Sequence, residues 1–384
     1  MHYFLSAGEP SGDLHGSNLA RALRRLDPAA RLAGFGGGRM EAVGARLLYP
    51  LARVPVMWFA AAIARIPFFY RLLRNAERYL EEQRPDAVIL IDYPGFNFAL
   101  AKRARRAGIP VFYFVPPQMW GWAGWRVKKM RRLIDHTLCT LTFEYDWYSR
   151  RGVRADLVGH PYFDELAAQA PDRAFLESQR GRGGEVVALL PGSRMSEVRR
   201  NFPMMVRAAQ RVRSARPDVR FLVASFNEEQ AAAARALLAK TDLPAEVHVG
   251  RTPEIIELAA ACVSVSGSVS LELMHRLKPT VIVYKISRFG TLLKNLLLRC
   301  RFITLVNLLA NEELYPEFLT RHDESEAIAG KVLAWLEDER SRSDLELRLR
   351  QLRDRVAQPG ACDRAAGRIV EELRRRSSAP RAVA

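Results

Sequence analysis

The sequence is poor in cysteine, in acidic residues and in long apolar runs, and each shortage excludes a class of protein. No run reaches the roughly 18–20 uninterrupted apolar residues of a transmembrane helix. Acidic residues number 42 against 59 lysines and arginines, so the net charge is +17. That excess indicates a polyanionic partner: nucleic acid, an anionic membrane or a phosphorylated substrate. The cysteines lie too far apart for a disulfide framework or a metal site, which favours a reducing cytosol; they are Cys139, Cys262, Cys300 and Cys362.

What the chain does contain is an alternation of short apolar runs with helical patterns, and this alternation occurs twice. Apolar runs at 3–7, 86–91 and 111–115 predict buried strands in the first half. After a glycine-rich stretch the pattern restarts with runs such as 186–190 and 262–265. Strands that alternate with helices predict parallel sheets covered on both faces. We therefore predict an α/β protein of two Rossmann-like domains with a ligand-binding cleft between them.

The composition along the chain also predicts domain boundaries. We expect an N-terminal domain over 1–165, a linker over 166–185 and a C-terminal domain over 186–340. A helical segment then covers 341–376, and the tail over 377–384 is expected to fray. All the motifs below follow predicted strands, and open α/β sheets bind ligands beyond the carboxyl ends of their strands.

Two strand–turn–helix motifs in the second half predict a nucleotide site. The run at 186–190 ends in Pro-Gly-Ser-Arg and a helical pattern follows, so backbone N–H groups and a guanidinium meet at a helix N-terminus. A diphosphate fits such a turn. The stretch 266–272 repeats the layout, which suggests a nucleotide held between the two turns. The predicted nucleotide-binding residues here are Gly192, Ser193, Arg194, Ser266, Gly267 and Ser268.

The stretch 8–13, Gly-Glu-Pro-Ser-Gly-Asp, follows the first predicted strand and opens a helix. Glycine allows close approach of a ligand, and Ser11 is a candidate helix cap. Glu9 and Asp13 argue against bare phosphate and favour sugar hydroxyls. We predict substrate contacts from Gly8, Glu9, Ser11 and Asp13, with an ordinary capped turn as the alternative. The glycine-rich stretch 34–40 predicts a loop at the mouth of the cleft.

Asp92 follows the buried strand at 86–91 and is the candidate general base. A carboxylate at the carboxyl edge of a sheet is well placed to accept a proton from an attacking hydroxyl. The alternative is an aspartate that caps the next turn, and spacing alone leaves both interpretations open.

Two aromatic and apolar segments suggest contact with a surface. Residues 116–126 contain three tryptophans beside cations. Such a loop could stack nucleic-acid bases or bind a lipid headgroup, and the alternative is a packed loop without a ligand. Residues 56–74 are apolar but broken by Arg65 and Pro67, which suits an interfacial element or a core helix, and 292–299 has the same character. The predicted membrane or acyl-chain contacts are Trp58, Phe59, Ile63, Phe68, Phe69, Trp120 and Trp122.

Taken together, these motifs resemble one family, the lipid-A-disaccharide synthases, which are membrane-associated glycosyltransferases of lipid A biosynthesis. The similarity covers nearly the whole chain in the same order, and the collinear set is highly specific. The matching motifs lie at 8–13, 36–40, 91–97 (Ile-Asp-Tyr-Pro-Gly-Phe-Asn), 116–122 (Pro-Pro-Gln-Met-Trp-Gly-Trp), 158–161 (Val-Gly-His-Pro), 190–194, 266–272, 283–285 (Val-Tyr-Lys) and 305–310 (Leu-Val-Asn-Leu-Leu-Ala).

The resemblance implies a GT-B-type fold, with the last helices returning to the N-terminal domain. It implies that UDP-2,3-diacylglucosamine and 2,3-diacylglucosamine 1-phosphate give a β-1,6-linked disaccharide 1-phosphate plus UDP, with inversion. By carry-over Asp92 matches the family's general base. Gly95 replaces a second acid that some relatives carry, and Lys285 replaces an arginine. The positions that match the nucleotide side are Ser193, Arg194, Glu272, Tyr284 and Asn307.

The implied partners are the two acylated sugars and the anionic inner leaflet, so we expect a cytoplasmic protein that is peripheral on the inner face of the cytoplasmic membrane. We expect no nucleic acid partner, and the oligomeric state, a homodimer included, stays open. No acidic pair follows a strand as in metal-dependent glycosyltransferases, so we expect neither metal nor cofactor, and we interpret His15 and His160 as structural. The alternatives are a UDP-sugar epimerase, a muropeptide lipid glycosyltransferase, or a basic nucleic-acid-binding protein.

Overall fold

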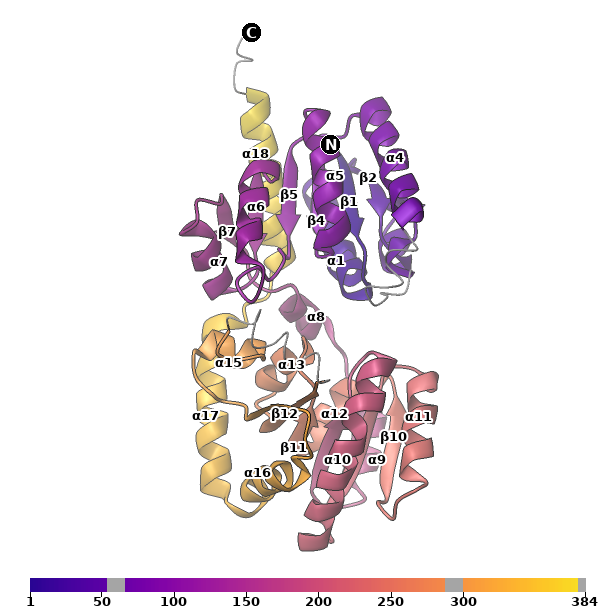
Figure 1. Ribbon diagram of the computed structural model, residues 1–384, viewed down its shortest axis with the longest axis vertical. Helices are drawn as coiled ribbons and strands as arrows, with labels where there is room; N and C mark the ends of the chain where they lie inside the picture. The colour runs from indigo at the N-terminus through magenta and orange to yellow at the C-terminus, as the bar shows by residue number, and fades with distance from the viewer. Residues whose placement is uncertain (54–65, 287–299, 379–384) are drawn as a thin grey trace. The chain divides into compact units, whose positions relative to one another are not determined.

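The computed structural model describes residues 1–53, 66–286 and 300–378, which form two compact units (Figure 1). The first unit comprises Met1–Ala167 together with Gln358–Ala384, and the second comprises Ala168–Ala357. Each unit is built on one parallel sheet. The predicted α/β fold class is therefore confirmed in both halves of the chain.

The sheet of the first unit has seven strands, and its central strands are buried apolar runs such as Ala-Val-Ile-Leu-Ile. Every neighbouring pair is parallel. In spatial order the strands are β3 (Arg46–Tyr49), β2 (Arg31–Phe35), β1 (His2–Ala7), β4 (Ala87–Ile91), β5 (Val111–Phe114), β6 (His136–Cys139) and β7 (Ala155–Leu157).

Alternate residues of these strands build a hydrophobic core on each face of the sheet. Tyr3 and Leu5 of β1 face a core shared with α1 (Pro10–Leu26) and α18 (Ala361–Ser378). Phe4 faces a second core. The helices that contribute to the second core are α4 (Ile66–Gln83), α5 (Pro94–Arg106), α6 (Val127–Leu133) and α7 (Thr142–Ser149). The short elements of this unit are α2 (Gly38–Ala42), η1 (Leu51–Arg53), η2 (Gly124–Arg126) and α8 (Tyr162–Ala168).

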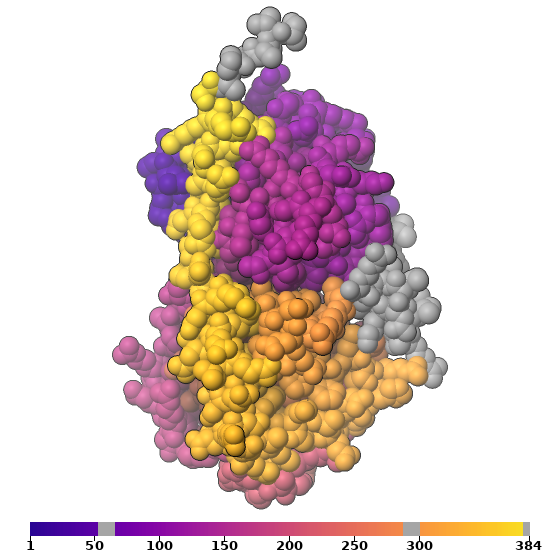
Figure 2. Space-filling model, turned by 90° about the vertical axis from the view of Figure 1, so that its left-hand side faces the viewer, coloured from indigo at the N-terminus to yellow at the C-terminus, as the bar shows by residue number. Residues whose placement is uncertain are grey.

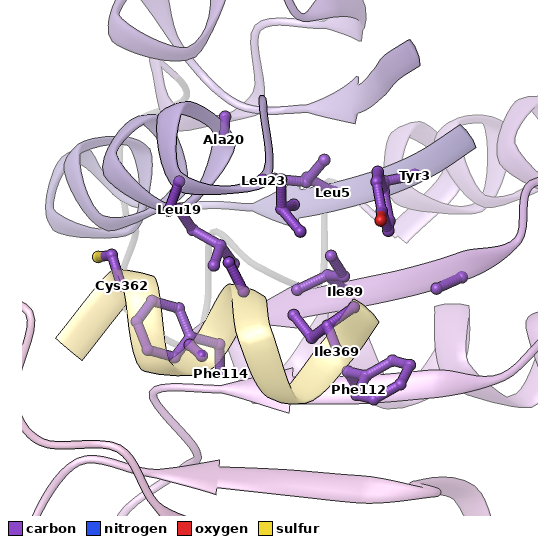
Figure 3. Packing of buried hydrophobic residues seen from close by; sticks show 14 of the residues in the cluster. Tyr3, Leu5, Leu19, Ala20, Leu23, Ile89, Phe112, Phe114, Cys362 and Ile369 are labelled. Atoms are coloured by element: carbon purple, nitrogen blue, oxygen red, sulfur yellow. The ribbon is translucent and has the colours of Figure 1, made fainter. Parts of the chain in front are cut away.

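The last helix, α18, is an integral part of the first unit although the second unit precedes it in the sequence. Figure 2 shows it lying along the surface of this unit, and Arg154 there makes two bonds of 3.0 and 2.8 Å to Glu372. The Asp164 carboxylate accepts from the backbone N–H groups of residues 360–362 at 2.5–3.1 Å, which caps the helix. Figure 3 shows Cys362 and Ile369 among the core side chains.

The sheet of the second unit has six parallel strands. In spatial order they are β10 (Ala245–Val249), β9 (Arg220–Ser225), β8 (Val186–Leu190), β11 (Ala259–Ser264), β12 (Thr280–Lys285) and β13 (Glu317–Thr320). Its helices are α9 (Arg173–Arg180), α10 (Met195–Ala215), α11 (Glu228–Leu238), α12 (Thr252–Leu258), α13 (Val269–His275), α15 (Leu305–Ala310), α16 (Ser325–Glu337) and α17 (Glu339–Val356).

Both sheets have the strand order of a Rossmann fold, with one extra strand at the edge of the first. The order reverses between β1 and β4 in the first unit and between β8 and β11 in the second. A crevice forms outside the carboxyl ends of the strands at each such point, because the connections leave on opposite sides. The motifs at 8–13, 91–97, 190–194 and 266–272 follow the strands on either side of these two points.

The unit boundaries differ in detail from the predicted ones. The segment 341–376 was expected to return to the N-terminal domain as a whole, but α17 belongs to the second unit, where it packs against α13 and α16. The predicted linker 166–185 contains α9, whose first turn is capped by the Asp172 carboxylate at 3.1 Å from the Phe175 N–H. Of the predicted frayed tail, residues 379–384 lie outside the described residues.

The packing of α18 predicts the effect of trimming its core face. Ile369 is fully buried, so Ile369→Ala should lower the free energy of unfolding of the first unit by about 2–5 kcal/mol. Urea denaturation followed by tryptophan fluorescence measures this, because every tryptophan except Trp335 lies in that unit's sequence. Leu347→Ala on the exposed side of α17 is the control. Equal midpoints for the two variants would contradict the packing of α18.

Candidate active site

The loops that follow β1 and β4 meet at the point where the strand order of the first unit reverses. Gly8 lies against the Tyr93 ring, and a Cβ at Gly8 would come within 2.3 Å of Tyr93 Cδ1. Glycine is therefore required at this position. Asp92 and Tyr93 both adopt left-handed backbone conformations, with φ of 51° and 47°. Such values are uncommon outside glycine and are concentrated at functional sites.

Two side chains hold the strained turn at Asp92. Its carbonyl oxygen accepts bonds from Asn97 Nδ2 at 2.7 Å and from Tyr113 Oη at 2.6 Å. Asn97 is fully buried and also accepts a bond from Ser6 Oγ at 2.7 Å, so it ties the ends of β1 and β4 together. Helix α5 has its N-cap at Tyr93. Asp92 therefore does not occupy the N-cap position of α5.

Asp92 lines a pocket of about 220 Å³. The rest of its wall comes from the start of α5 and from the tryptophan-rich loop 116–126. The structure thus brings the predicted general base and one predicted acyl-contact residue, Trp122, into one pocket of the first unit. The lining residues are Asp92, Pro94, Pro117, Gln118, Met119, Trp122, Ala123 and Arg126.

The tryptophan-rich loop is anchored at Trp120, whose indole Nε1 donates to Glu144 Oε1 at 3.4 Å and whose ring packs edge-on against Phe143 at 4.8 Å. Glu144 is buried and also accepts from the Thr140 backbone N–H at 3.0 Å. Burial raises the pKa of the Glu144 carboxyl to about 7. Trp120 therefore has a structural role, whereas Trp122 is 47% exposed at the pocket.

Five cations lie at the end of the tryptophan-rich loop and on the helix α6 that follows it. The Arg126 guanidinium lies 5.2 Å from the centre of the Trp122 ring, and α6 carries the others. No carboxylate in the described ranges forms an ion pair with any member of this group. Their charge therefore remains available to an external anion. The members are Arg126, Lys128, Lys129, Arg131 and Arg132.

The predicted apolar contacts on α4 are packed inward. Phe68 and Phe69 are half-buried and continue an aromatic row from Tyr49 to Phe96, with ring centres 5.3–6.1 Å apart. On the described part of this segment the exposed residues are Ile66, Pro67, Tyr70, Arg71 and Arg74. Three further predicted contacts, Trp58, Phe59 and Ile63, lie outside the described residues, as does 292–299. Among the helices of 1–53, 66–286 and 300–378, none is long and apolar enough to cross a membrane.

In the stretch 8–13, the bonds of Asp13 lie within the first unit. Helix α1 begins at Pro10 with Glu9 as its N-cap, so Ser11, which is exposed, is not the cap that the sequence suggested. The buried Asp13 carboxylate accepts from the backbone N–H groups of Gly37, Arg39 and Met40 at 2.8–3.0 Å. It thereby caps α2, a short helix that occupies part of the expected glycine-rich loop.

His15 and His160, for which the sequence favours a structural role, are both buried. The rings of His15 and His160 lie 6.0 Å apart. Burial lowers the pKa of His15 to about 4 and that of His160 to about 3, so both are neutral near pH 7. His160 Nδ1 accepts a bond from the Tyr162 N–H at 3.2 Å. This environment agrees with the structural interpretation of both residues.

In the second unit, the turn after β8 presents an exposed cation at a helix N-terminus. Gly192 has a φ of 117°, and a Cβ there would lie 2.5 Å from Glu197 Oε2. Arg194 is the N-cap of α10. Its backbone N–H donates to Glu197 Oε2 at 3.2 Å, and its guanidinium Nη1 donates to Glu197 Oε1 at 3.1 Å. The Arg194 side chain is 59% exposed, and Ser193 is exposed beside it. This is an anion-binding arrangement of the kind predicted from the sequence.

The loop after β11 lies next to that turn, because β8 and β11 are neighbours. Gly267 and Ser268 are exposed, while Ser266 Oγ donates to the Ile303 carbonyl at 2.9 Å. Glu272 on α13 is 2% exposed and accepts a bond from Arg276 Nε at 3.2 Å. The two predicted nucleotide turns are thus brought together, with Glu272 buried beneath the second.

The remaining predicted nucleotide residues differ in exposure. Tyr284 is half-buried near the end of β12, and Lys285 donates its backbone N–H to Asn201 Oδ1 at 2.7 Å. Asn307 is fully buried, and its amide makes four bonds of 2.7–2.9 Å to residues 314–317. Asn307 therefore fixes a loop from within.

Sequence reasoning overlooked the residues that hold the pocket. Asn97 and Arg126 lie inside or beside the recognised motifs but had no assigned role, and Glu144 was not singled out. Glu144 lies 24 residues from its partner Trp120, so no local pattern links them. In the part of the chain that the structure describes, no three His, Cys, Asp or Glu side chains gather as a metal site would require.

The chain was compared with known proteins. The family model described as lipid-A-disaccharide synthetase matches residues 3–368. The lipid-A-disaccharide synthase of Anaeromyxobacter dehalogenans is 36% identical over 374 residues, and that of Geobacter sulfurreducens is 33% identical over 368 residues. In both comparisons the match covers 96% of each chain.

Among solved structures, the chain is similar in fold to the UDP-GlcNAc 2-epimerase of Neisseria meningitidis and to a calicheamicin glycosyltransferase. The TM-scores are 0.59 and 0.61 at 12% and 16% identity. The matches cover 97% of this chain and 99% of the epimerase, and 98% of this chain and 99% of the glycosyltransferase. These likenesses show that the two Rossmann-like units form a GT-B-type fold.

The burial of Glu144 predicts a pH dependence of stability. The pKa of its carboxyl is about 7 in the folded protein against an ordinary 4.5. Between these two pH values the Glu144 carboxyl is therefore protonated in the folded protein and ionised in the unfolded chain. This stabilisation is complete below about pH 4.5 and is lost as the pH rises through about 7, by at most about 3 kcal/mol. Relative to Glu144→Gln, the wild-type protein should therefore lose thermal stability from about pH 5 to about pH 8.

Thermal unfolding of both proteins across this range measures the difference. Glu41→Gln, which changes an exposed glutamate of the same unit, should follow the wild-type curve. Parallel curves for the wild type and Glu144→Gln would show that the Glu144 carboxyl does not titrate in this range.

Proposed function

The chain belongs to the lipid-A-disaccharide synthase family, a glycosyltransferase family of lipid A biosynthesis, and we propose that it joins two acylated glucosamines. The donor is UDP-2,3-diacylglucosamine and the acceptor is 2,3-diacylglucosamine 1-phosphate. The products are the β-1,6-linked disaccharide 1-phosphate and UDP. The observation that carries this proposal is the Asp92 carboxylate, which a strained and well-supported turn presents to a pocket at the carboxyl edge of the first sheet.

In the proposed mechanism the acceptor sugar occupies the pocket with its 6-hydroxyl directed at Asp92. The carboxylate accepts the hydroxyl proton while the oxygen attacks the anomeric carbon of the donor. The bond between this carbon and the diphosphate breaks, and UDP leaves with the electron pair. A single displacement from the face opposite UDP inverts the anomeric configuration. Residue 95 is an exposed glycine and has no carboxylate, so Asp92 acts without a second acid at that position.

The donor's diphosphate binds at the turn after β8 in this proposal. The N–H groups at the start of α10 and the exposed Arg194 guanidinium neutralise it, and they also stabilise the charge that develops on UDP. Serine hydroxyls of the two turns and Tyr284 complete the nucleotide side. Asn307 is buried and acts by fixing the loop at 314–317, while the buried Glu272 is paired with Arg276 next to the second turn. This set of donors serves in place of a metal ion.

Both substrates carry acyl chains, so the proposal also includes a membrane surface. Trp122 is exposed beside the pocket, and the four exposed cations Lys128, Lys129, Arg131 and Arg132 have no carboxylate partner in the described ranges. Aromatic rings flanked by cations suit an anionic lipid surface. We assign this surface to the inner leaflet of the cytoplasmic membrane, where the enzyme is peripheral.

The proposal predicts that Asp92→Asn abolishes turnover and retains UDP binding, because the amide cannot accept the proton. Purified protein is incubated with both acylated sugars in buffer containing EDTA, and UDP and the disaccharide are detected by mass spectrometry. Wild-type protein should form both products, and the variant should lose at least about 100-fold in rate. UDP binding is measured separately by calorimetry.

Three results would contradict the proposal. Near-normal turnover of Asp92→Asn would remove this residue as the base. Activity that returns only on addition of a metal ion would refute metal independence. Conversion of the UDP-sugar without an acceptor would indicate an epimerase.

The placement of the diphosphate predicts the effect of Arg194→Ala. Loss of a charge-assisted bond to phosphate costs about 1.5–3 kcal/mol, so the Kd for UDP should rise about 10- to 100-fold. Arg213→Ala removes the same charge near the other end of α10 and serves as the control. Unchanged UDP affinity in Arg194→Ala, measured by calorimetry, would show that the diphosphate binds elsewhere.

A further inference from the structure

We propose that Arg126 recognises a phosphate monoester on the acceptor sugar, and that the Trp122 indole holds the Arg126 guanidinium in position. This inference rests on the proposed function, since it assigns a role in acceptor binding to a second residue of the pocket that Asp92 lines. It makes Arg126 the specificity-determining residue for a phosphorylated acceptor.

The first support is the pocket itself. Asp92 and Arg126 both line its wall, so one small cavity holds an acidic and a basic group. At roughly 30 Å³ per water, a volume of about 220 Å³ holds on the order of seven waters. That is room for a sugar head group and its polar substituents. A hydroxyl to be deprotonated suits the Asp92 carboxylate, and an anionic substituent of the same sugar suits the Arg126 guanidinium.

The second support is how Arg126 is held. Its guanidinium lies over the Trp122 ring, with 5.2 Å between Cζ and the ring centre. A cation–π contact is not a hydrogen bond of the guanidinium N–H groups, so these donors remain for a ligand. A phosphate monoester accepts two parallel bonds from that fork. Trp122 thus acts as a positioning residue.

The third support is that the charge of Arg126 is not neutralised within the described residues. Several half-buried arginines of this protein are paired with acids. Arg276 bonds to Glu257 at 2.8 Å and to Glu272 at 3.2 Å, and Arg216 bonds to Asp218 at 2.7 Å. A half-buried arginine in a pocket without such a pair is suited to an anionic ligand.

Phospholipid headgroups are a second source of phosphate. The cation in the pocket and the cations on the surface are distinct residues, so the two phosphate sources are assigned to different groups. Arg126 is half-buried and lines the pocket, whereas the four other cations of the group are exposed on α6 and do not line it. The exposed four suit a membrane surface. They are Lys128, Lys129, Arg131 and Arg132.

The test compares two short-chain, water-dispersed acceptors that differ in the 1-phosphate. Arg126→Ala should lower kcat/KM for the phosphorylated acceptor about 10- to 100-fold, mainly through KM, and leave the dephosphorylated acceptor nearly unaffected. The preference for the phosphorylated acceptor should shrink by the same factor. Arg126→Lys should restore part of the preference, and Lys129→Ala should keep all of it. UDP binding should be unchanged in every variant, which also verifies folding.

The role of Trp122 is tested in the same assay. Trp122→Phe keeps an aromatic face and should retain most of the preference, whereas Trp122→Ala should lose it. Equal losses in both variants would show that Trp122 does not hold Arg126 through its ring.

Undiminished preference in Arg126→Ala would overturn the proposal. Equal loss of binding to phosphatidylglycerol vesicles in Arg126→Ala and Lys129→Ala, with the preference unchanged, would assign Arg126 to the membrane instead. Failure of the wild-type protein to form any disaccharide would refute the proposed function. In that event calorimetry with the phosphorylated sugar alone still decides the role of Arg126, because the proposal requires weaker binding by Arg126→Ala.

Discussion

The left-handed turn at Asp92 and Tyr93 is the constraint on which the rest of the first unit's site depends. Such conformations cost on the order of 1–3 kcal/mol per residue and persist when surrounding groups fix them. Here Asn97 and Tyr113 bond to the Asp92 carbonyl, and the Tyr93 ring occupies the space that Gly8 leaves open. The backbone is thereby fixed at the carboxyl end of β4, so the Asp92 side chain belongs to the pocket wall. Without these supports the turn would relax and the carboxylate would lose its place.

The same principle organises both units, although the chemistry assigned to each differs. In each sheet the loops on either side of the order reversal carry the polar groups. The first unit has a carboxylate, an anchored tryptophan loop and a cation that faces a small pocket. The second has an exposed serine and arginine at the start of α10, next to the loop after β11. We infer from this division that the first unit activates the acceptor and the second binds the leaving nucleotide.

The strands and motifs that lie at the centre of each sheet were predictable from the sequence, whereas two of the edge strands and the internal bonds were not. The apolar run of β4 is unambiguous because the strand is buried on both faces. The edge strands β3 and β13 were missed, because both are four residues long, mixed in polarity and half-buried. Asp13 and Asn307 were predicted to contact ligands but are bonded to backbone groups of their own unit. The partner of a buried polar group depends on tertiary contacts, which local spacing does not show.

The most direct test of this account is a crystal structure of the Asp92→Asn variant with UDP and the acceptor sugar bound. The substitution should prevent turnover, so both ligands persist. The account predicts that the acceptor's 6-hydroxyl oxygen lies about 2.6–3.2 Å from the side chain at position 92, inside the pocket walled by the tryptophan loop. An acceptor bound away from this pocket, or held with its hydroxyl turned from position 92, would contradict the account.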